Sequence, residues 1–392
     1  MAQYEVRVLP RLDFQGQAVA VVVAKAAWSV GEDRVPRPDE SPEPILFADV
    51  LVDGEDPTVS PVLMGSDTAL LKNRTDVIVH GSAYAPGGNP VGLFDVTVTV
   101  GNHRRTLRVF GPRTAAWRKP SGKTPSPPLF TDPAPVRKVA IDFRNAYGGA
   151  ARYKVPGGEE VVLIPCPVNP LGKGYCVQNS PEGLEGLLLP QIEDPDALLA
   201  PDSLVRPLGA LEELPSAAGF GVQGASWYPR VAYFGVMPHE VEHTKAAVAD
   251  IVKGMDPQKD EAAIAMMQDY SPPLMAPEFF QAAAPGMTFP HLAGNEPFIL
   301  GNLAPGGFTG FDLPGRAPLV SLDRGDGPRN VRMTLDTVAF LAETGRLILT
   351  WRGRMPLVDP GEFDRLPAMP LDVRDGSIEE SARLIEGSPP RA

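Results

Sequence analysis

The sequence contains very little cysteine. Cys166 and Cys176 are the two cysteines in 392 residues, and they stand ten positions apart. Two cysteines cannot form a disulfide framework, and their spacing is not the C-x-x-C pattern of redox and zinc sites. We therefore expect both to be small, buried core residues.

Basic charge and long apolar runs are also scarce. The formal net charge is −12, which argues against nucleic acid as a partner because that binding needs a basic surface. The apolar stretch 18–27 covers ten residues and contains Lys25, so it is too short to span a bilayer. Residues 1–5 show no basic region followed by an apolar stretch, as a signal peptide would. These features predict a cytoplasmic protein without membrane insertion.

Proline and glycine are abundant instead, with 45 and 39 residues. Proline disrupts helices and central strands, so this composition favours many ordered connections over long helices. Valine-rich or alternating segments predict strands at 18–28, 76–84, 94–100 and 106–110, and again at 331–335 and 346–351. Gly101-Asn102 predicts that 94–100 and 106–110 form a hairpin.

Helical patterns are confined to a few segments. Residues 240–255 and 260–270 are rich in alanine and contain no proline, and 377–385 is a candidate for a short terminal helix. We therefore predict a mainly β protein, sandwich-like and α+β overall, with a loop-rich central region and a helical insertion at about 235–272. Residues 1–320 would form one domain, and a C-terminal β-hairpin within 321–392 would complete the same body.

One catalytic pattern is present. His239, Glu240 and His243 follow the H-E-x-x-H spacing, in which two His side chains on one helix face bind zinc and the Glu activates water. A third ligand would be needed, for which His291 or Glu261 could serve, and no longer metzincin motif follows. We expect an exposed polar first turn here, with no metal and no cofactor. A zinc metallopeptidase is the alternative interpretation.

Phrases rich in Gly, Pro and Asn dominate the centre of the chain. They include 147–149, 169–175 and 189–195, and a related phrase occurs at 292–296. None places a nucleophile beside a base, so they indicate a shaped surface more than a reaction centre. Asn and Gly tolerate positive φ, and we expect Asn169, Gly172 and Gly174 to form a loop that the fold requires.

Taken in order, these phrases resemble a bacterial family of domains of unknown function, family 2169, which is found with type VI secretion systems. The first matching phrase is at 71–77 and the last is at 301–303. The similarity as a whole covers about residues 10 to 320. Asn73 stands where the family has proline, and the helical stretch between Phe234 and Pro272 replaces a short segment. That stretch is where a particular cargo could be recognised.

The resemblance implies an adaptor or chaperone without enzymatic activity. Its partners would be a secreted effector, a spike-tip protein with the PAAR repeat, and the VgrG spike. A ligand-binding β module is a third hypothesis. The candidate residues for partner binding or loop shaping are Asn169, Gly172, Gly174, Tyr175, Glu193, Trp227, Arg230 and Glu296.

Overall fold

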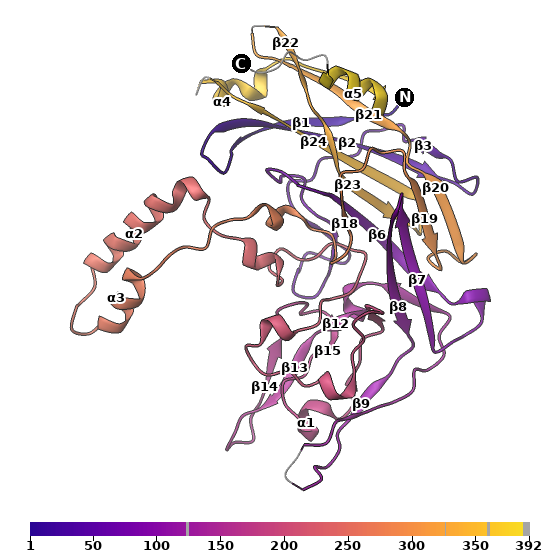
Figure 1. Cartoon of the computed structure of the whole chain (residues 1–392), viewed down its shortest axis with the longest axis vertical. Coiled ribbons are helices and arrows are strands. Elements are labelled where there is room, and N and C mark those ends of the chain that lie inside the picture. Colours follow the sequence, from indigo (N-terminus) through magenta and orange to yellow (C-terminus); the bar gives the residue numbers. More distant parts are fainter. Residues whose placement is uncertain (123–124, 326, 359–360, 387–392) are drawn as a thin grey trace.

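The computed structural model describes residues 1–122, 125–325, 327–358 and 361–386. It is an elongated body built mainly of strands, from which two helices project to one side (Figure 1). The predicted mainly β, α+β fold class is therefore confirmed. The strands are grouped in several sheets, of which two form the centre of the molecule.

The largest sheet joins the two ends of the chain. Its strand order is β1-β2-β24-β23-β6-β11, with β3 pairing with β2 and β18 pairing with β6. The pairs on this path are antiparallel except β23 and β6, which run parallel. The strands are β1 (Glu5–Leu12), β2 (Ala18–Val30), β3 (Pro36–Pro38), β6 (Thr75–Tyr84), β11 (Lys138–Ile141), β18 (Thr288–Phe289), β23 (Thr334–Leu341) and β24 (Arg346–Pro356).

Strand β2 lies inside this sheet and is buried on both faces. Ala20 and Val22 belong to the main core, whereas Val21 and Val23 pack in a second apolar cluster with Leu70. Burial on both sides explains why this strand reads as a nearly continuous apolar run and not as an alternating one. The second cluster also includes Met237 and Phe280, which flank the projecting helices in the sequence, along with Leu9, Phe14, Ile45 and Leu71.

A second sheet packs against the first as a sandwich. Strands β7 and β8 form the predicted hairpin, and its alternating Val and Leu side chains are buried. Phe298 and Phe311 extend from this sheet to Phe340 of β23, with ring centroids 5.9 and 5.0 Å away. The order is β17 (Ile192–Glu193), β8 (His103–Phe110), β7 (Leu93–Val100), β19 (Pro297–Gly301) and β20 (Phe308–Asp312).

The central region forms the end of the molecule drawn at the bottom of Figure 1. It contains the hairpin β13–β14, which periodicity did not predict, and short strands held by long connections. These elements are β9 (Thr114–Ala116), β10 (Leu129–Phe130), β12 (Tyr147–Gly148), β13 (Ala150–Lys154), β14 (Val161–Pro165), β15 (Lys173–Gly174), β16 (Leu187–Leu188) and the short helix α1 (Pro181–Leu184).

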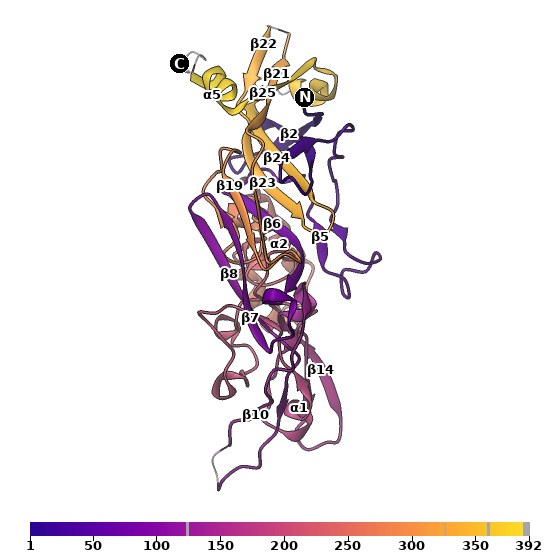
Figure 2. The same ribbon diagram turned by 90° about the vertical axis from the view of Figure 1, so that its right-hand side faces the viewer.

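The opposite end carries a three-stranded sheet and two helices beside the N-terminus (Figures 1 and 2). Helix α5 (Ile378–Glu386) confirms the predicted terminal helix. The other elements here are β21 (Arg316–Asp323), β22 (Pro328–Val331), β25 (Leu371–Ser377) and α4 (Gly361–Arg365). A separate two-strand pair, β4 (Val50–Leu51) and β5 (Val62–Met64), lies along the side of the body visible in Figure 2.

Helices α2 (Val241–Lys253) and α3 (Glu261–Gln268) confirm the helical prediction for 240–255 and 260–270. They pack against each other and extend away from the β body (Figure 1). Neither helix contains a buried residue. No helix within the described ranges has the length and apolar character needed to cross a bilayer.

Candidate functional site

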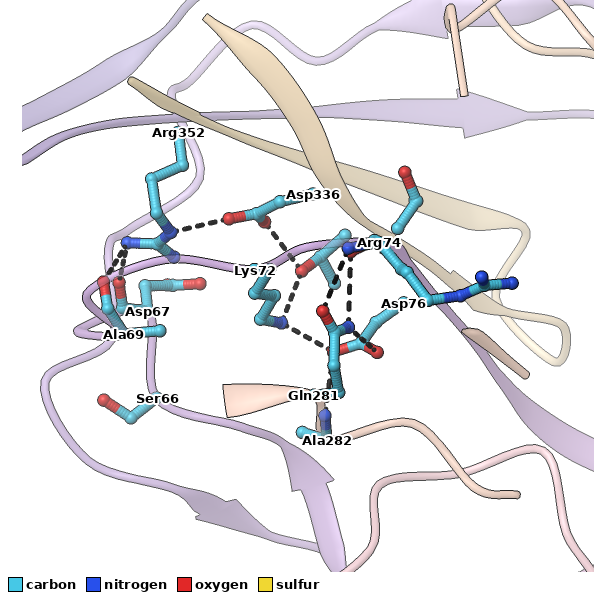
Figure 3. A network of polar contacts seen from close by, with 12 residues as sticks. Ser66, Asp67, Ala69, Lys72, Arg74, Asp76, Gln281, Ala282, Asp336 and Arg352 are labelled. Atoms are coloured by element: carbon cyan, nitrogen blue, oxygen red, sulfur yellow. Dashed lines mark hydrogen bonds and ion pairs between the residues drawn. The ribbon is translucent and has the colours of Figure 1, made fainter. Parts of the chain in front are cut away.

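Buried charged side chains form a network at the centre of the large sheet (Figure 3). Arg352 of β24 donates from Nε to Asp336 Oδ2 at 2.6 Å. Its Nη1 donates to the backbone carbonyl oxygens of Asp67 and Ala69 at 2.9 and 2.8 Å. Both partners of this ion pair are almost fully buried. Arg352 therefore holds residues 67–69 against the large sheet through these two hydrogen bonds.

The network continues through Lys72. Its Nζ donates to Asp76 Oδ2 at 2.8 Å and to Thr337 Oγ1 at 2.9 Å. Asp76 also accepts from Gln281 Nε2 at 2.8 Å and from the Ala282 backbone N–H at 2.9 Å. A buried charge destabilises a protein unless it is paired and hydrogen-bonded, and these groups are. The network therefore fixes the segment after the projecting helices against the sheet.

A cavity of about 210 Å³ adjoins this network. Its lining includes the aromatic rings of Phe279 and Phe280 and the charged side chains of Arg230, Asp49 and Lys72. The other lining residues are Met64, Gly65, Ser66, Asp67, Thr68, Ala69, Ile78, Ala225, Ala282 and Thr337. The combination of two aromatic rings with a few charged groups is typical of a binding site.

Arg230, predicted from the sequence as a candidate, is held at the rim of this cavity. Its Nε donates to the Phe279 carbonyl at 2.9 Å and its Nη1 to the Gln223 carbonyl at 2.7 Å. The guanidinium carbon also lies 5.4 Å from the centre of the Phe279 ring, within range of a cation–π contact. Burial lowers the pKa of Arg230, and the carboxylates of Asp49 and Asp76 oppose that shift.

We call residues 235–274 the arm. Its two ends are joined at the body, because the Val236 N–H donates to the Pro273 carbonyl at 2.9 Å and the Met275 N–H donates to the Val236 carbonyl at 2.9 Å. A Cβ on Gly235 would lie 2.2 Å from the Pro273 carbonyl oxygen, so this close approach requires glycine. The arm therefore leaves the body and returns at one narrow point beside the cavity.

Large apolar side chains are exposed along the arm and at its base. Met266 is 80% exposed, and Ile251 and Phe234 are each 57% exposed. The others are Val231, Tyr233, Tyr270 and Leu274. An exposed apolar patch of this kind marks an interaction surface more often than a solvent-facing one.

The H-E-x-x-H residues are not arranged as the motif requires. His239 lies in a 3₁₀ turn, Pro238–Glu240, and α2 begins after it at Val241, so only His243 belongs to the α-helix. The predicted exposed first turn is wrong for His239, whose ring packs closely on Gly16 and is half-buried. His243 is exposed. Among the described residues, no three His, Cys, Asp or Glu side chains gather as a metal-ligand set.

Asn169 is fully buried in the central region, and its side chain hydrogen-bonds three backbone groups. Its Nδ2 donates to the carbonyl oxygens of Phe143 and Tyr147 at 2.7 and 3.0 Å, and its Oδ1 accepts the Leu171 N–H at 3.1 Å. The expected positive φ applies to Gly174 (93°), but Asn169 and Gly172 lie outside that backbone region. Gly172 is required for another reason, because a Cβ there would lie 2.5 Å from the Ala146 carbonyl oxygen.

The remaining predicted residues lie at separate places. Tyr175 and Trp227 are buried core residues, and the Trp227 ring meets Phe143 edge-to-face. Glu193 forms a buried ion pair with Arg113, and burial raises the pKa of Glu193 although Arg113 opposes the rise. Glu296 caps a turn by accepting from the backbone N–H groups of residues 293 and 294. Of the predicted set, Arg230 alone lines the cavity beside the arm.

Most residues of the cavity and its network could not be identified from the sequence. Lys72 and Asp76 lay within a phrase that was noted, but nothing marked them as partners of residues more than 200 positions away. Phe279 and Phe280 followed the helical segment without any periodic pattern. The one available signal was the pair of adjacent aromatic residues just after the insertion.

Comparison with known proteins places the chain in a family. Residues 15–352 match the model of a family described as uncharacterized proteins conserved in bacteria, DUF2169. No curated protein and no solved structure matches the chain. The family match covers the large sheet from β2 into β24, the second sheet, the central region and the arm, and it leaves out β1. The chain therefore belongs to the bacterial family DUF2169.

Proposed function

We propose that this protein is an adaptor of the type VI secretion system, acting in the bacterial cytoplasm. It would bind a cognate effector, or the PAAR-repeat protein linked to that effector, and load it onto the VgrG spike. The observation that carries the proposal is the arm, whose helices α2 and α3 expose large apolar side chains and contribute none to the core.

The arm is poorly explained as a structural element. Helices of 13 and 8 residues are marginal in water unless tertiary packing covers one face. Here α2 and α3 cover each other in part, and the β body covers neither. A partner that packs on Ile251 and Met266 would supply the missing burial. The unbranched methionine side chain adapts to many partner shapes.

The base of the arm extends this surface toward the body. Phe234 packs on Phe279 with ring centroids 5.1 Å apart, and Phe279 continues into the wall of the 210 Å³ cavity. An apolar helix or extended segment of an effector could contact the arm and insert one side chain into the cavity. Covering such a segment before export is the work expected of a secretion chaperone.

The test is co-expression with candidate effectors and PAAR-repeat proteins, followed by co-purification. The binding variant is Ile251→Glu with Met266→Glu, which places two charges on the exposed arm. Its matched control is Leu163→Glu, which changes a side chain that is 68% exposed. Strand β14, to which Leu163 belongs, lies in the central region and not on the projecting helices (Figure 1). We expect the double variant to lose at least tenfold in affinity, because two buried contacts are replaced by desolvated charges.

A second variant replaces residues 240–270 by a short Gly-Ser linker. The Val236–Leu274 bridge keeps the two ends together, so the β body should fold with an unchanged melting temperature and lose effector binding. A folded armless protein that keeps full affinity contradicts the proposed surface. Intact-mass analysis of the effector separates an adaptor from a peptidase. A truncated effector that appears only when Glu240 is present would favour the metallopeptidase.

A further inference from the structure

A second cavity, of about 340 Å³, also adjoins the buried network. Lys72 lines both cavities, and Asp336 and Arg352 of the network line this one. The remaining walls come from the 71–73 segment, from β24 and from the segment before β23. Its charged and polar lining consists mainly of Lys72, Asn73, His291, Arg332, Arg352 and Arg354.

Positive charge in this cavity is not balanced by acids. Asp336 is the acidic residue among its lining residues, and it is already engaged by Arg352 and by the Thr337 hydroxyl. Arg332 and Arg354 are exposed, and their guanidinium groups form no hydrogen bond or ion pair with any residue that the structure describes. Two guanidinium groups without an acidic partner therefore line this cavity, whereas Lys72 and Arg352 are paired with Asp76 and Asp336. The protein as a whole has a net charge of −12.

The side chains that line the cavity indicate which kind of anion would bind there: a carboxylate, a phosphate or a nucleotide. The planar guanidinium fork binds carboxylates and phosphates through paired hydrogen bonds. His291 supplies the one aromatic ring among the lining residues, and they include no Phe, Tyr or Trp ring on which a nucleobase could stack. No unengaged carboxylate among them could hold the magnesium ion that usually accompanies a nucleoside polyphosphate. Its volume is at the lower end for a small-molecule site, which suits one or two side chains.

We propose that this cavity binds the carboxylates of an acidic loop on a partner protein. Two Asp or Glu side chains of that loop would each pair with Arg332 or Arg354, and Asn73 would bind the loop backbone. Since the arm is a separate surface, this contact does not depend on the adaptor role. Such pairs at the edge of an interface speed association and set orientation more than they add affinity.

Purified full-length protein and a fluorescein-labelled peptide with four alternating Asp and Glu residues provide the test. Fluorescence anisotropy should show binding that weakens as NaCl rises from 20 to 300 mM, over a range in which exposed charges become screened. Arg332→Gln with Arg354→Gln should weaken binding at least tenfold. The matched control, Arg104→Gln with Arg118→Gln, removes the same charge from exposed arginines elsewhere and should leave binding unchanged.

Three outcomes would overturn the proposal. Equal loss in both double variants would show attraction by net charge alone. Pyrophosphate that binds and displaces the peptide at far lower concentration would assign the cavity to a phosphate ligand. Dimerisation that Arg332→Gln and Arg354→Gln abolish would assign it to an acidic segment of a second copy, such as residues 32–56, which contain nine Asp or Glu and two Arg. The Ile251→Glu and Met266→Glu variant should bind the peptide normally, so failure here and failure of the adaptor proposal are distinguishable.

Discussion

Replacing Asn169 by alanine should destabilise the protein, because this side chain satisfies three backbone groups in the interior. The side chain is fully buried, and its three hydrogen bonds measure 2.7, 3.0 and 3.1 Å. They tie the turn at Phe143 to β12 and to the loop that precedes β15. Alanine cannot make any of them.

The three groups do not contribute equally to the loss. The Phe143 carbonyl also accepts the Ala146 N–H at 3.1 Å, and Leu171 is half-buried, so its N–H can reach water. The largest part of the loss comes from the Tyr147 carbonyl, which is left without its hydrogen bond from Asn169 in a buried residue. A buried polar group left unpaired costs about 1–3 kcal/mol, so we expect a total loss of about 2–4 kcal/mol. That is a large part of a typical unfolding free energy of about 5–15 kcal/mol.

Urea unfolding followed by tryptophan fluorescence measures this loss. Trp227 is buried and its ring centroid lies 5.2 Å from that of Phe143, so it reports on the region that Asn169 holds. The control is Asn295→Ala, which removes an exposed amide. If Asn169→Ala unfolds within about 0.5 kcal/mol of the parent, as surface substitutions do, the reasoning is refuted. A variant of parental stability that no longer binds effector would instead place this loop at the interface.

Two further predictions concern buried charge. Lys25 is fully buried and its Nζ lies 2.8 Å from Asp67 Oδ2, so Lys25→Met should cost about 3–5 kcal/mol in urea unfolding. Adding Asp67→Asn should recover part of that loss, since the amide can still accept the Leu46 N–H, and an unimproved double variant would contradict this account. Burial lowers the pKa of His80. A backbone hydrogen bond to Leu63 and the carboxylate of Asp142 act in the opposite direction and offset only part of this shift. The free energy of unfolding should therefore fall as pH drops below the unfolded-state value of about 6.5, by up to about 1.4 kcal/mol per pH unit, and this slope should be shallower in His80→Gln. Equal slopes in the two proteins between pH 7.5 and 5.5 would argue against it.

Elements that follow from local patterns could be predicted from the sequence. The alternation at 94–100 gave the hairpin β7–β8, because a half-buried strand needs apolar residues at every second position. The alanine-rich segments gave α2 and α3, because helix propensity is set by nearby residues. The β13–β14 hairpin has no such alternation, since its exposed positions include Val161 and Leu163, and it was missed.

The site could not be predicted in the same way, because long-range pairing assembles it. Lys72 meets Thr337 across 265 positions, and Asp76 meets Ala282 across 206 positions. No local rule relates the members of such a pair. Gly172 illustrates a subtler limit. Its sequence context correctly marked a position where glycine is needed, but the cause is a close approach to the Ala146 carbonyl and not a positive φ.

The buried network and the arm are two parts of one arrangement. The segment that leaves the arm is hydrogen-bonded to Asp76 through Gln281 and Ala282, and Phe280 packs in the apolar cluster on the outer face of β2. The base of the arm is therefore held on β6 and β2 of the large sheet, whereas helices α2 and α3 extend away from it. A rigid base reduces the conformational entropy that a binding surface loses when a partner docks. The charged network can thus stabilise a complex without contacting the partner, because its hydrogen bonds hold the exposed apolar surface in position.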